Sequence, residues 1–511
     1  MSDSFNSSET RLPYPLGKIT FPWLGGVALL ALFVAIGLYA YSQQLRYGEI
    51  VTGMRTIGQG GVVWGLYICF VVYFIGISFA GMSVAALVRL SKVTALEPLT
   101  RIAELLTIVS LPMGALVVLM DLGRPLQGIL YLPQFARPMS PFFGTFTLVV
   151  SGYLFSSLVY FYLAGRADAA YCKKAAPQKL RWLYSIWASG YCGTPIEQER
   201  HRRVSFWLAI FILPLLVVAH STLGFVFGIQ GGRPGWFSAL QAPGFVVLAG
   251  CSGIGMLIIM TALIRRTLHL QNTITNEAFR ILGNFLWILT LVYLYFMVVE
   301  ELTANYASSE VETALAHEVV FGTYGVIFWI TVASFLLTLV IGLVQYLLQR
   351  TSVGWLVTAG ISVNIASILK RFLIVIPSQT HGMLLPYTEG SYIPSWVEIS
   401  IVVGLFSLAS LIAVVFIKVF PIVPVVRHEH TDKVPLRDPM RSLIFCLTLC
   451  VGLILMISGF LLSLRIGTLP HLDPLVPYSP TLFILGVMIS FYSSAVYETI
   501  PKARELTKES S

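Results

Sequence analysis

Long apolar runs separated by short polar segments dominate this sequence. A run of about 20 predominantly apolar residues is long enough to cross the hydrocarbon core of a bilayer as a helix. The pattern predicts an all-α polytopic membrane protein with about 12 transmembrane helices. The predicted spans lie at about 22–42, 62–89, 101–120, 142–164, 204–226, 244–264, 281–301, 319–345, 353–376, 395–419, 441–464 and 480–499.

The composition agrees with this class. The 511 residues are 56% hydrophobic and only 11% charged, and the mean hydropathy is +0.81. A soluble protein with so little charge could not cover its core with polar surface. The water-soluble globular classes are therefore excluded.

The distribution of the 33 Lys and Arg residues predicts the orientation. If the N-terminus is cytoplasmic, the segments on that side carry 25 of them and the outer loops carry 8. This bias follows the positive-inside rule. We therefore expect a multi-pass protein of the cell inner (plasma) membrane with both termini cytoplasmic and with Asp121 near the outer face. The polar N-terminus lacks the pattern of a cleaved signal, so the first span is expected to be retained.

Intrinsic metal and haem sites are not expected. The six cysteines have no CxxC spacing, which argues against a protein-held iron–sulfur cluster or zinc site. Haem b needs axial histidines on facing helices, and His220 is the one convincing intramembrane histidine. The sequence also has no Walker motif, HExxH motif or nucleotide fingerprint, and no nucleic-acid partner is expected.

Two polar segments on the predicted inner side differ in character. Residues 165–203 contain the stretch KLRWLYSIWA (179–188), which is either an amphipathic helix on the inner leaflet or a solvated basic loop. Residues 420–439 are rich in proline and predict a cytoplasmic linker. This linker would join a ten-helix body to a terminal hairpin of two helices.

A short motif occurs twice, four helices apart. Gly, Ser, Gly and Met occupy positions 76, 78, 81 and 82 in the second predicted helix, and 250, 252, 255 and 256 in the sixth. The motif suggests a parallel repeat that relates a first four-helix bundle, helices 2–5, to a second, helices 6–9. Small residues at this spacing also allow any two helices to approach closely, and one pair of motifs does not distinguish the two explanations.

The predicted spans and the repeat divide the chain into six parts. Helices 1 and 10 flank the two bundles and complete the body. The parts are an N-terminal segment with the first helix (1–61), the first bundle (62–226), the second bundle (244–376), the tenth helix (395–419), the linker (420–439) and the C-terminal hairpin (440–499).

Ionisable residues at membrane depth gather towards the predicted outer face. A turn from Asp121 to Pro125 interrupts one apolar run, and the repeat aligns Asp121 with Glu300 and Glu301. A charge at this depth is costly on the lipid face, so each side chain should point into a bundle and meet a partner. Carboxylates and histidine exchange protons, and cations hold a carbonyl or phenolate oxygen. The sequence predicts a polar pocket built from Asp121, Arg124, His220, Glu300, Glu301, Lys370, Arg371 and Glu398.

Several of these residues have structural alternatives. His220 fits an interhelical hydrogen-bond donor equally well, and one of Lys370 and Arg371 fits a side chain that reaches the outer headgroups. Glu300 and Glu301 point about 100° apart on a helix, so we expect one of them to face the pocket. The alternative function is a proton-coupled secondary transporter of a lipophilic or anionic solute, although its binding residues would lie nearer the midplane.

Six stretches between about residues 60 and 400 match motifs of a known family, in the same order. They are Asp121-Leu-Gly-Arg124-Pro125; Ser140-Pro141; His220-Ser-Thr-Leu-Gly224; Gly232-Arg233-Pro234-Gly235-Trp236 with Ala242-Pro243; Lys370-Arg371-Phe372 through Ile376-Pro377-Ser378; and Tyr392-x-Pro394-Ser395-Trp396-Val397-Glu398. The chain thereby resembles the polysulfide reductase membrane-subunit family, NrfD/PsrC, and within it the larger ten-helix branch of DsrP-, HmcC- and ActC-like proteins.

The resemblance implies a quinone-interacting subunit of a multisubunit respiratory oxidoreductase that is not active alone. It would exchange electrons between membrane quinone and a ferredoxin-like iron–sulfur subunit on the outer face, and this exchange would be coupled to proton movement. No cofactor would belong to the chain itself. Menaquinone or ubiquinone would be its bound substrate, the iron–sulfur clusters would lie in the partner, and a molybdopterin or multihaem cytochrome subunit is a further expected partner.

The resemblance also implies roles by position. Asp121 and His220 would accept protons or contact quinone, and Arg124 would orient the Asp121 turn. A matching polar cluster in the second bundle, on a quinone or proton path, would comprise Glu300, Glu301, Lys370, Arg371 and Glu398.

Two features depart from the family pattern. Phe79 stands where some relatives carry a histidine in helix 2, so a quinone contact is not carried over to that position. Helices 11 and 12 exceed the ten-helix body, and we expect their hairpin to pack against a partner.

Overall fold

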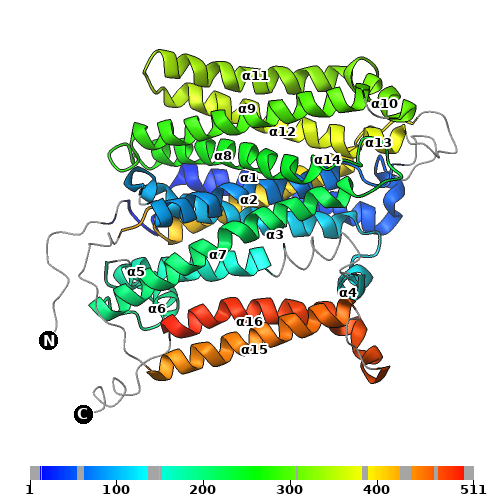
Figure 1. Cartoon of the computed structure of the whole chain (residues 1–511). Helices are drawn as coiled ribbons and strands as arrows, with labels where there is room; N and C mark the ends of the chain where they lie inside the picture. Colours follow the sequence, from blue (N-terminus) through cyan, green and yellow to red (C-terminus); the bar gives the residue numbers. More distant parts are fainter. Residues whose placement is uncertain are drawn as a thin grey trace, which may run out of the picture.

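The computed structural model describes residues 12, 14–54, 62–91, 93–135, 149, 152–175, 177–306, 309–381, 390–425, 439–464 and 470–499. Regular structure in these residues is helical throughout (Figure 1). The long helices are α1 (Phe21–Tyr47), α2 (Leu66–Ser91), α3 (Thr100–Asp121), α5 (Phe155–Ala175), α7 (Pro195–Gly228), α8 (Gln241–Thr267), α9 (Asn276–Tyr306), α11 (Gly325–Leu347), α12 (Val353–Val375), α14 (Trp396–Val419), α15 (Pro439–Leu464) and α16 (Ser479–Thr499). The short helices are α4 (Pro125–Phe135), α6 (Arg181–Ala188), α10 (Glu310–Val320) and α13 (Pro377–Thr380).

Within the described ranges, 11 helices are long and apolar enough to cross a membrane. They coincide with 11 of the predicted spans, which confirms the all-α polytopic membrane fold. The remaining predicted span, at about 142–164, lies partly outside the described residues, and its described part leads into α5. A total of twelve spans therefore stays a prediction.

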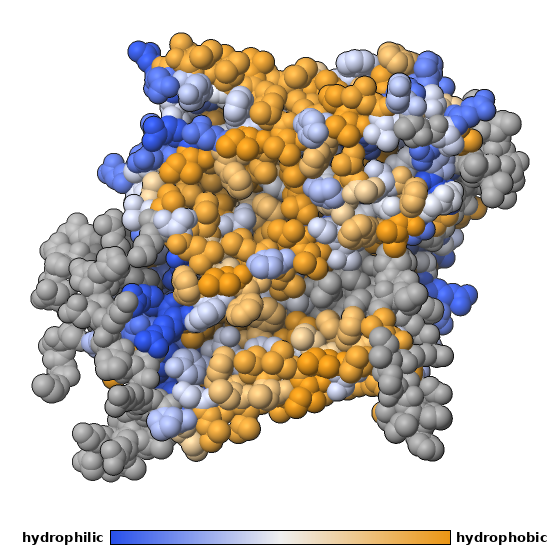
Figure 2. Space-filling view, viewed as in Figure 1, coloured by the Kyte–Doolittle hydropathy of each residue, from blue (hydrophilic) through white to orange (hydrophobic). Residues whose placement is uncertain are grey.

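Apolar residues cover most of the outside of the molecule, because lipid surrounds these helices in place of water. Figure 2 shows the apolar surface as a broad band, with hydrophilic residues gathered towards the two ends of the helices. The most buried of the spanning helices is α2, while α1 and α15 expose most of their apolar surface. The core of the protein therefore lies around α2.

Helix α2 is the centre of the packing. It contacts α3, α7, α8 and α12, and α9 and α11 lie beyond α8 and α12 (Figure 1). Helix α1 packs against α14, which also contacts α3 and α2. The hairpin of α15 and α16 joins the rest of the protein through contacts of α16 with α5, α7 and α4. The predicted division into two four-helix bundles, α2–α3–α5–α7 and α8–α9–α11–α12, remains a prediction.

Gly76 and Ser252, one residue from each copy of the repeated motif, lie where α2 packs against α8. A Cβ atom on Gly253 would lie 2.9 Å from both Ile77 O and Ala80 N. A Cβ on Gly76 would lie 3.2 Å from Ser252 Oγ. The two backbones approach this closely because small residues line both helices. Close packing therefore accounts for Gly76 and Gly253, and the parallel repeat stays a prediction.

We predict that Gly253→Ala destabilises the protein by about 1–3 kcal/mol, because backbone atoms of α2 occupy the position of the new methyl group. Gly244→Ala is the matched control, since it lies in the same helix and its Cβ would meet nothing within 4 Å. The control should be neutral or stabilising by up to about 1 kcal/mol. Thermal unfolding in nanodiscs measures both, and a Gly253→Ala protein as stable as wild type would contradict the contact.

The basic stretch at 179–188 is folded onto the body. Residues 181–188 form α6, in which Tyr184 is buried and Trp187 stacks on Phe420 with 4.3 Å between ring centroids. Trp182, on the other side of the helix, is exposed. The solvated-loop alternative is therefore wrong for this segment, because its aromatic side chains dock it against the end of α14.

The beginning of the predicted linker is also packed. Phe420, Ile422 and Val423 are buried. The hydroxyl of Tyr14 donates a hydrogen bond to Phe420 O at 2.9 Å and accepts one from Ile422 N at 2.8 Å. Residues 426–438 lie outside the described residues. The apolar start of this proline-rich stretch thus belongs to the helical body.

Candidate functional site

Asp121 ends α3 and is only 7% exposed. Beside it, the Gln44 side chain donates hydrogen bonds to Met120 O at 2.7 Å and to Glu49 Oε1 at 3.0 Å. The Tyr67 hydroxyl donates to Gln44 Oε1 at 2.7 Å. Polar side chains from α1 and α2 thus enclose the end of α3, and the Asp121 carboxylate lies inside the helix assembly and not on its lipid-facing surface.

Arg124 is exposed, although it follows Asp121 by three residues. Its carbonyl accepts a hydrogen bond from Gly128 N at 2.9 Å, which closes the first turn of α4. The structure describes both residues, and it shows no ion pair between the Arg124 guanidinium and the Asp121 carboxylate. The backbone of Arg124 therefore shapes the turn, and orientation of Asp121 by the Arg124 side chain stays a prediction.

His220 is buried in α7 and lies against α2. Its Nδ1 is 2.7 Å from Leu216 O, and its Nε2 is 3.1 Å from Ile75 O. The rings of Phe79 and Tyr153 contact the imidazole with centroid separations of 5.5 Å and 5.8 Å. A neutral imidazole has one N–H, so it can donate to only one of these carbonyls, whereas the protonated ring can donate to both. The contact with Ile75 O joins α7 to α2, so the geometry fits an interhelical hydrogen bond of the neutral ring as well as a protonated ring.

Buried hydroxyl groups that the sequence pattern does not reveal surround the same stretch of α2. The carbonyl of Ser78 accepts hydrogen bonds from Thr107 Oγ1 and Tyr153 OH, both at 2.8 Å. All three side chains are buried. Hydroxyl residues within apolar runs carry no charge signal, so their pairing becomes visible only when the helices are assembled.

Arg371 lies in the interior between α2, α8 and α12. It donates hydrogen bonds to Ser367 O at 2.9 Å and to Ser252 Oγ at 3.2 Å. Its guanidinium carbon lies 5.4 Å from the centroid of the Tyr73 ring, an arrangement that stabilises a cation. Among the described residues, no carboxylate forms an ion pair with it. The headgroup alternative is wrong for Arg371, because the side chain is buried.

Lys370 precedes Arg371 but faces another helix. Its Nζ pairs with Glu300 Oε2 at 2.6 Å, and its side chain is 7% exposed. The headgroup alternative is therefore wrong for Lys370 as well. Successive residues on a helix point about 100° apart, so these two neighbouring cations enter different environments.

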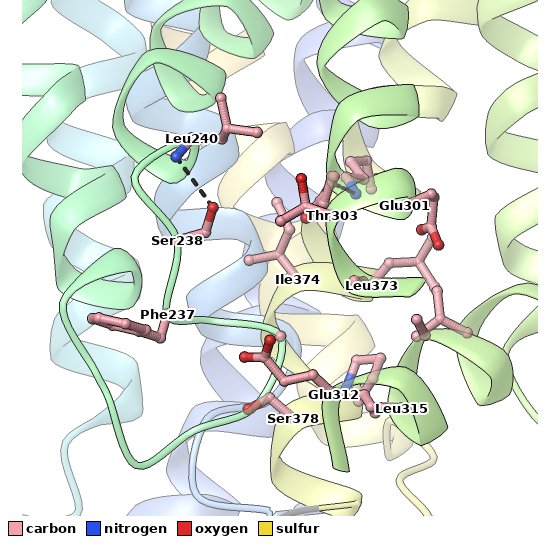
Figure 3. Close-up of a pocket in the computed structure, with 17 residues that line it drawn as sticks. Phe237, Ser238, Leu240, Glu301, Thr303, Glu312, Leu315, Leu373, Ile374 and Ser378 are labelled. Atoms are coloured by element: carbon pink, nitrogen blue, oxygen red, sulfur yellow. Dashed lines mark hydrogen bonds and ion pairs between the residues drawn. The ribbon is translucent and has the colours of Figure 1, made fainter. Parts of the chain in front are cut away.

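A cavity of about 110 Å³ opens beside the Lys370–Glu300 pair (Figure 3). It lies between α9, α10, α12 and the loop from Gly235 to Leu240. Both Glu300 and Glu301 line it, contrary to the expectation that only one would face a pocket. The reason is that α10 and α12 both pack against α9, so the cavity covers more than one side of that helix.

Glu398 is buried and accepts hydrogen bonds from three places in the chain. Its Oε2 accepts from Gly53 N at 2.8 Å and Ser395 N at 2.9 Å, and its Oε1 accepts from Tyr392 OH at 2.5 Å. With Ser395 it forms a capping box at the start of α14. Burial and the neighbouring carboxylate raise the pKa of Tyr392, so its phenol remains a donor. These contacts explain Glu398 as a structural residue that joins the α1–α2 connection to α14.

A second set of buried charges lies at the predicted inner ends of the helices. Arg101 of α3 pairs with Asp168 of α5 at 2.9 Å and lies 3.4 Å from Glu104. Arg166 of α5 pairs with Glu498 of α16 at 2.9 Å. Buried charges thus also occur at the predicted inner ends, and the expectation that ionisable groups at membrane depth lie on one side stays a prediction. Helix α5 runs well past the predicted apolar span, so residues assigned to a loop are buried between helices.

Comparison with known proteins assigns the chain to a family. Residues 56–381 match the family described as "Polysulphide reductase, NrfD". This match covers more than half of the chain and includes Asp121, His220, Glu300 and Lys370.

Three relatives are similar over most of their lengths. A Halobacterium salinarum protein, named as a dimethyl sulfoxide reductase membrane subunit, is 28% identical over 83% of this chain and 96% of that protein. A subunit of the selenate reductase of Mesobacillus selenatarsenatis is 25% identical over 79% of this chain and 95% of that protein. The Hdr-like menaquinol oxidoreductase integral membrane subunit of Archaeoglobus fulgidus is 26% identical over 78% and 93%. With its apolar helices and its family match, this chain belongs to the NrfD polysulphide reductase family of integral membrane proteins.

Proposed function

We propose that this chain is the quinone-interacting membrane subunit of a multisubunit respiratory oxidoreductase. In this proposal it resides in the cell inner membrane with both termini cytoplasmic, as the distribution of Lys and Arg favours. Electrons pass between membrane quinone, either menaquinone or ubiquinone, and a ferredoxin-like iron–sulfur subunit on the outer face. The exchange of protons with quinone is coupled to this transfer.

The names of the relatives support the general part of the proposal, namely a membrane subunit of an oxidoreductase. All three are named as subunits of reductases or oxidoreductases, two of them as membrane subunits, and one of these belongs to a menaquinol oxidoreductase. The observation that carries the finer part is the burial of two proton-exchanging groups, Asp121 at the end of α3 and His220 beside α2. Ionisable side chains within membrane helices are rare and are most often functional.

Quinol oxidation requires acceptors for protons as well as for electrons. Each quinol that becomes quinone releases two electrons and two protons. In our proposal the electrons leave to the partner subunit, while the Asp121 carboxylate and the His220 imidazole accept the protons. The same groups act as proton donors when quinone is reduced.

Two further residues support this chemistry in the proposal. Arg371 Nη2 lies 2.5 Å from the position that a Cβ on Gly76 would occupy. Gly76 follows Ile75, whose carbonyl faces His220. The cation therefore places a positive potential on the same turn of α2, where it favours a reduced, more negative quinone oxygen. Arg124 contributes by shaping the turn after Asp121.

A proton-coupled transporter of a lipophilic or anionic solute is the alternative that buried charges also fit. Its binding residues are expected near the membrane midplane. Asp121 instead ends its helix, and the names of the relatives describe oxidoreductase subunits. The redox proposal is therefore the better supported of the two.

Copurification with a quinol assay tests the proposal. An affinity-tagged chain from its native cells should copurify with an iron-containing subunit, and the complex should oxidise a short-chain menaquinol while reducing an acceptor dye. The chain alone in proteoliposomes should neither oxidise quinol nor take up solute. Isolation as a monomer that accumulates a solute would overturn the proposal and support the transporter.

A further inference from the structure

The cavity beside Lys370 has a polar end and apolar walls. At the polar end, Lys370 Nζ and Glu300 Oε2 are 2.6 Å apart. Glu301 Oε2 is shielded from solvent and has no hydrogen-bond partner in the described part of the chain. Figure 3 shows the Glu301 side chain near Leu373 of α12, with Glu312 of α10 on the other side of the cavity. A ligand at the polar end therefore meets the Lys370–Glu300 pair, with the Glu301 side chain beside it.

The walls suit a hydrophobic ring. Leu240, Leu315, Leu373 and Ile374 contribute aliphatic surface to the cavity. Its volume is about 110 Å³, the order of magnitude of cavities that accommodate a benzene ring, roughly 150 Å³.

A second, smaller cavity lies beside the first. This cavity, of about 20 Å³, shares Leu240, Glu300, Lys370 and Ile374 with the first. It reaches Phe296 and Met297 on the next turn of α9. Apolar side chains therefore lie next to the polar end, which suits a lipophile with a ring-shaped head group.

The charges of the lining restrict the head group. Three carboxylates, from Glu300, Glu301 and Glu312, face one ammonium group, from Lys370. A phosphate or carboxylate head group would be repelled by this excess of negative charge. A neutral phenolic ring is compatible, because its hydroxyl can donate to a carboxylate of the lining and its second oxygen can accept from Lys370.

We propose that this cavity binds the head group of a neutral quinol, as a site additional to the one near Asp121 and His220. None of the lining residues belongs to that first site. The choice of quinol among neutral phenolic lipophiles rests on the proposed function, whereas the head-group chemistry follows from the cavity. The site binds quinol next to Lys370 whether or not electrons are transferred there.

Photolabelling of the intact complex tests this site. The probe is an azido-substituted benzoquinone with a short isoprenoid tail, reduced to its quinol and bound to the complex in nanodiscs. Mass spectrometry should find label in peptides that contain residues 300–315 and 370–378. An excess of unlabelled short-chain quinol should remove this label.

Matched variants identify the contacts. Glu301→Gln and Lys370→Met should each lower labelling of these peptides at least fivefold while leaving label near Asp121 unchanged. Glu277→Gln is the control, because Glu277 lies on the same helix with its side chain 59% exposed. The control should label like wild type.

Three results would overturn this inference. One is a complex that oxidises quinol but carries label only near Asp121, which leaves the proposed function intact. Another is label in α9 and α12 that both variants retain at the wild-type level. The third is label that dodecyltrimethylammonium displaces and quinol does not, since the cavity would then bind cationic amphiphiles. A complex that neither oxidises quinol nor takes up label anywhere would instead overturn the proposed function as well.

Discussion

Replacing Asp121 with Asn is expected to lower quinol-dependent electron transfer of the assembled complex at least tenfold. Asparagine keeps the size of the side chain but cannot accept a proton, so proton transfer from quinol loses its base. A tenfold loss corresponds to about 1.4 kcal/mol of transition-state stabilisation. The measurement is the steady-state rate of dye reduction by menaquinol, normalised to the iron content of the purified complex.

His220→Ala should lower the same rate at least tenfold, since it removes the second proton acceptor. This variant also removes the contacts with Leu216 O and Ile75 O, so its thermal stability and its partner content must be measured alongside. Glu277→Gln, at the exposed start of α9, is the control for both substitutions. Full activity of Asp121→Asn and His220→Ala, with wild-type assembly, would remove both residues from the mechanism.

The helical fold could be predicted because a membrane imposes a minimum length on each apolar span. The span predicted at 395–419 corresponds to a helix at Trp396–Val419, and that at 353–376 to one at Val353–Val375. Prediction failed at the inner ends, where hydropathy falls while the helix continues. Helix α7 begins at Pro195, nine residues before its apolar span, because Thr194 and Glu197 form a capping box there.

The candidate site could be predicted in part. Burial of Asp121, His220 and Lys370 follows from the cost of a charge on the lipid face. The partner of each group cannot be predicted from the sequence, because it depends on which helices pack together. Lys370 thus meets Glu300 of α9, while Arg371 meets hydroxyl and aromatic groups of α8 and α2.

The sequence around Glu398 carries the signal of a helix N-terminus. Glu398 stands three residues after Ser395, immediately before an apolar run, which is the spacing of a capping box. That spacing predicts a structural acceptor at the helix N-terminus, as the structure shows. By contrast, nothing local to Arg166 and Glu498 predicts their pairing, since they are 332 residues apart.

Glu498→Gln is expected to cause the largest loss of stability, about 3–5 kcal/mol. Glu498 Oε1 accepts from Arg166 at 2.9 Å and lies 3.0 Å from His201 Nδ1, and both Glu498 and Arg166 are buried. Glutamine retains the shape but leaves the Arg166 guanidinium buried without its counter-charge. Because these contacts join α16 to α5 and α7, the terminal hairpin should separate at a lower temperature than the rest of the body unfolds. Scanning fluorimetry in nanodiscs, together with limited proteolysis at increasing temperature, measures both effects.

A second substitution distinguishes the charge from the packing. If the unpaired charge causes the loss, Arg166→Met combined with Glu498→Gln should be more stable than Glu498→Gln alone, because no unpaired guanidinium remains. The exposed pair Arg280–Glu277, with both side chains 59% exposed, provides the control. Glu277→Gln should change stability by less than about 1 kcal/mol, since solvent screens such a pair. Equal losses in the single and double variants would show that the hairpin is held by packing and not by this buried ion pair.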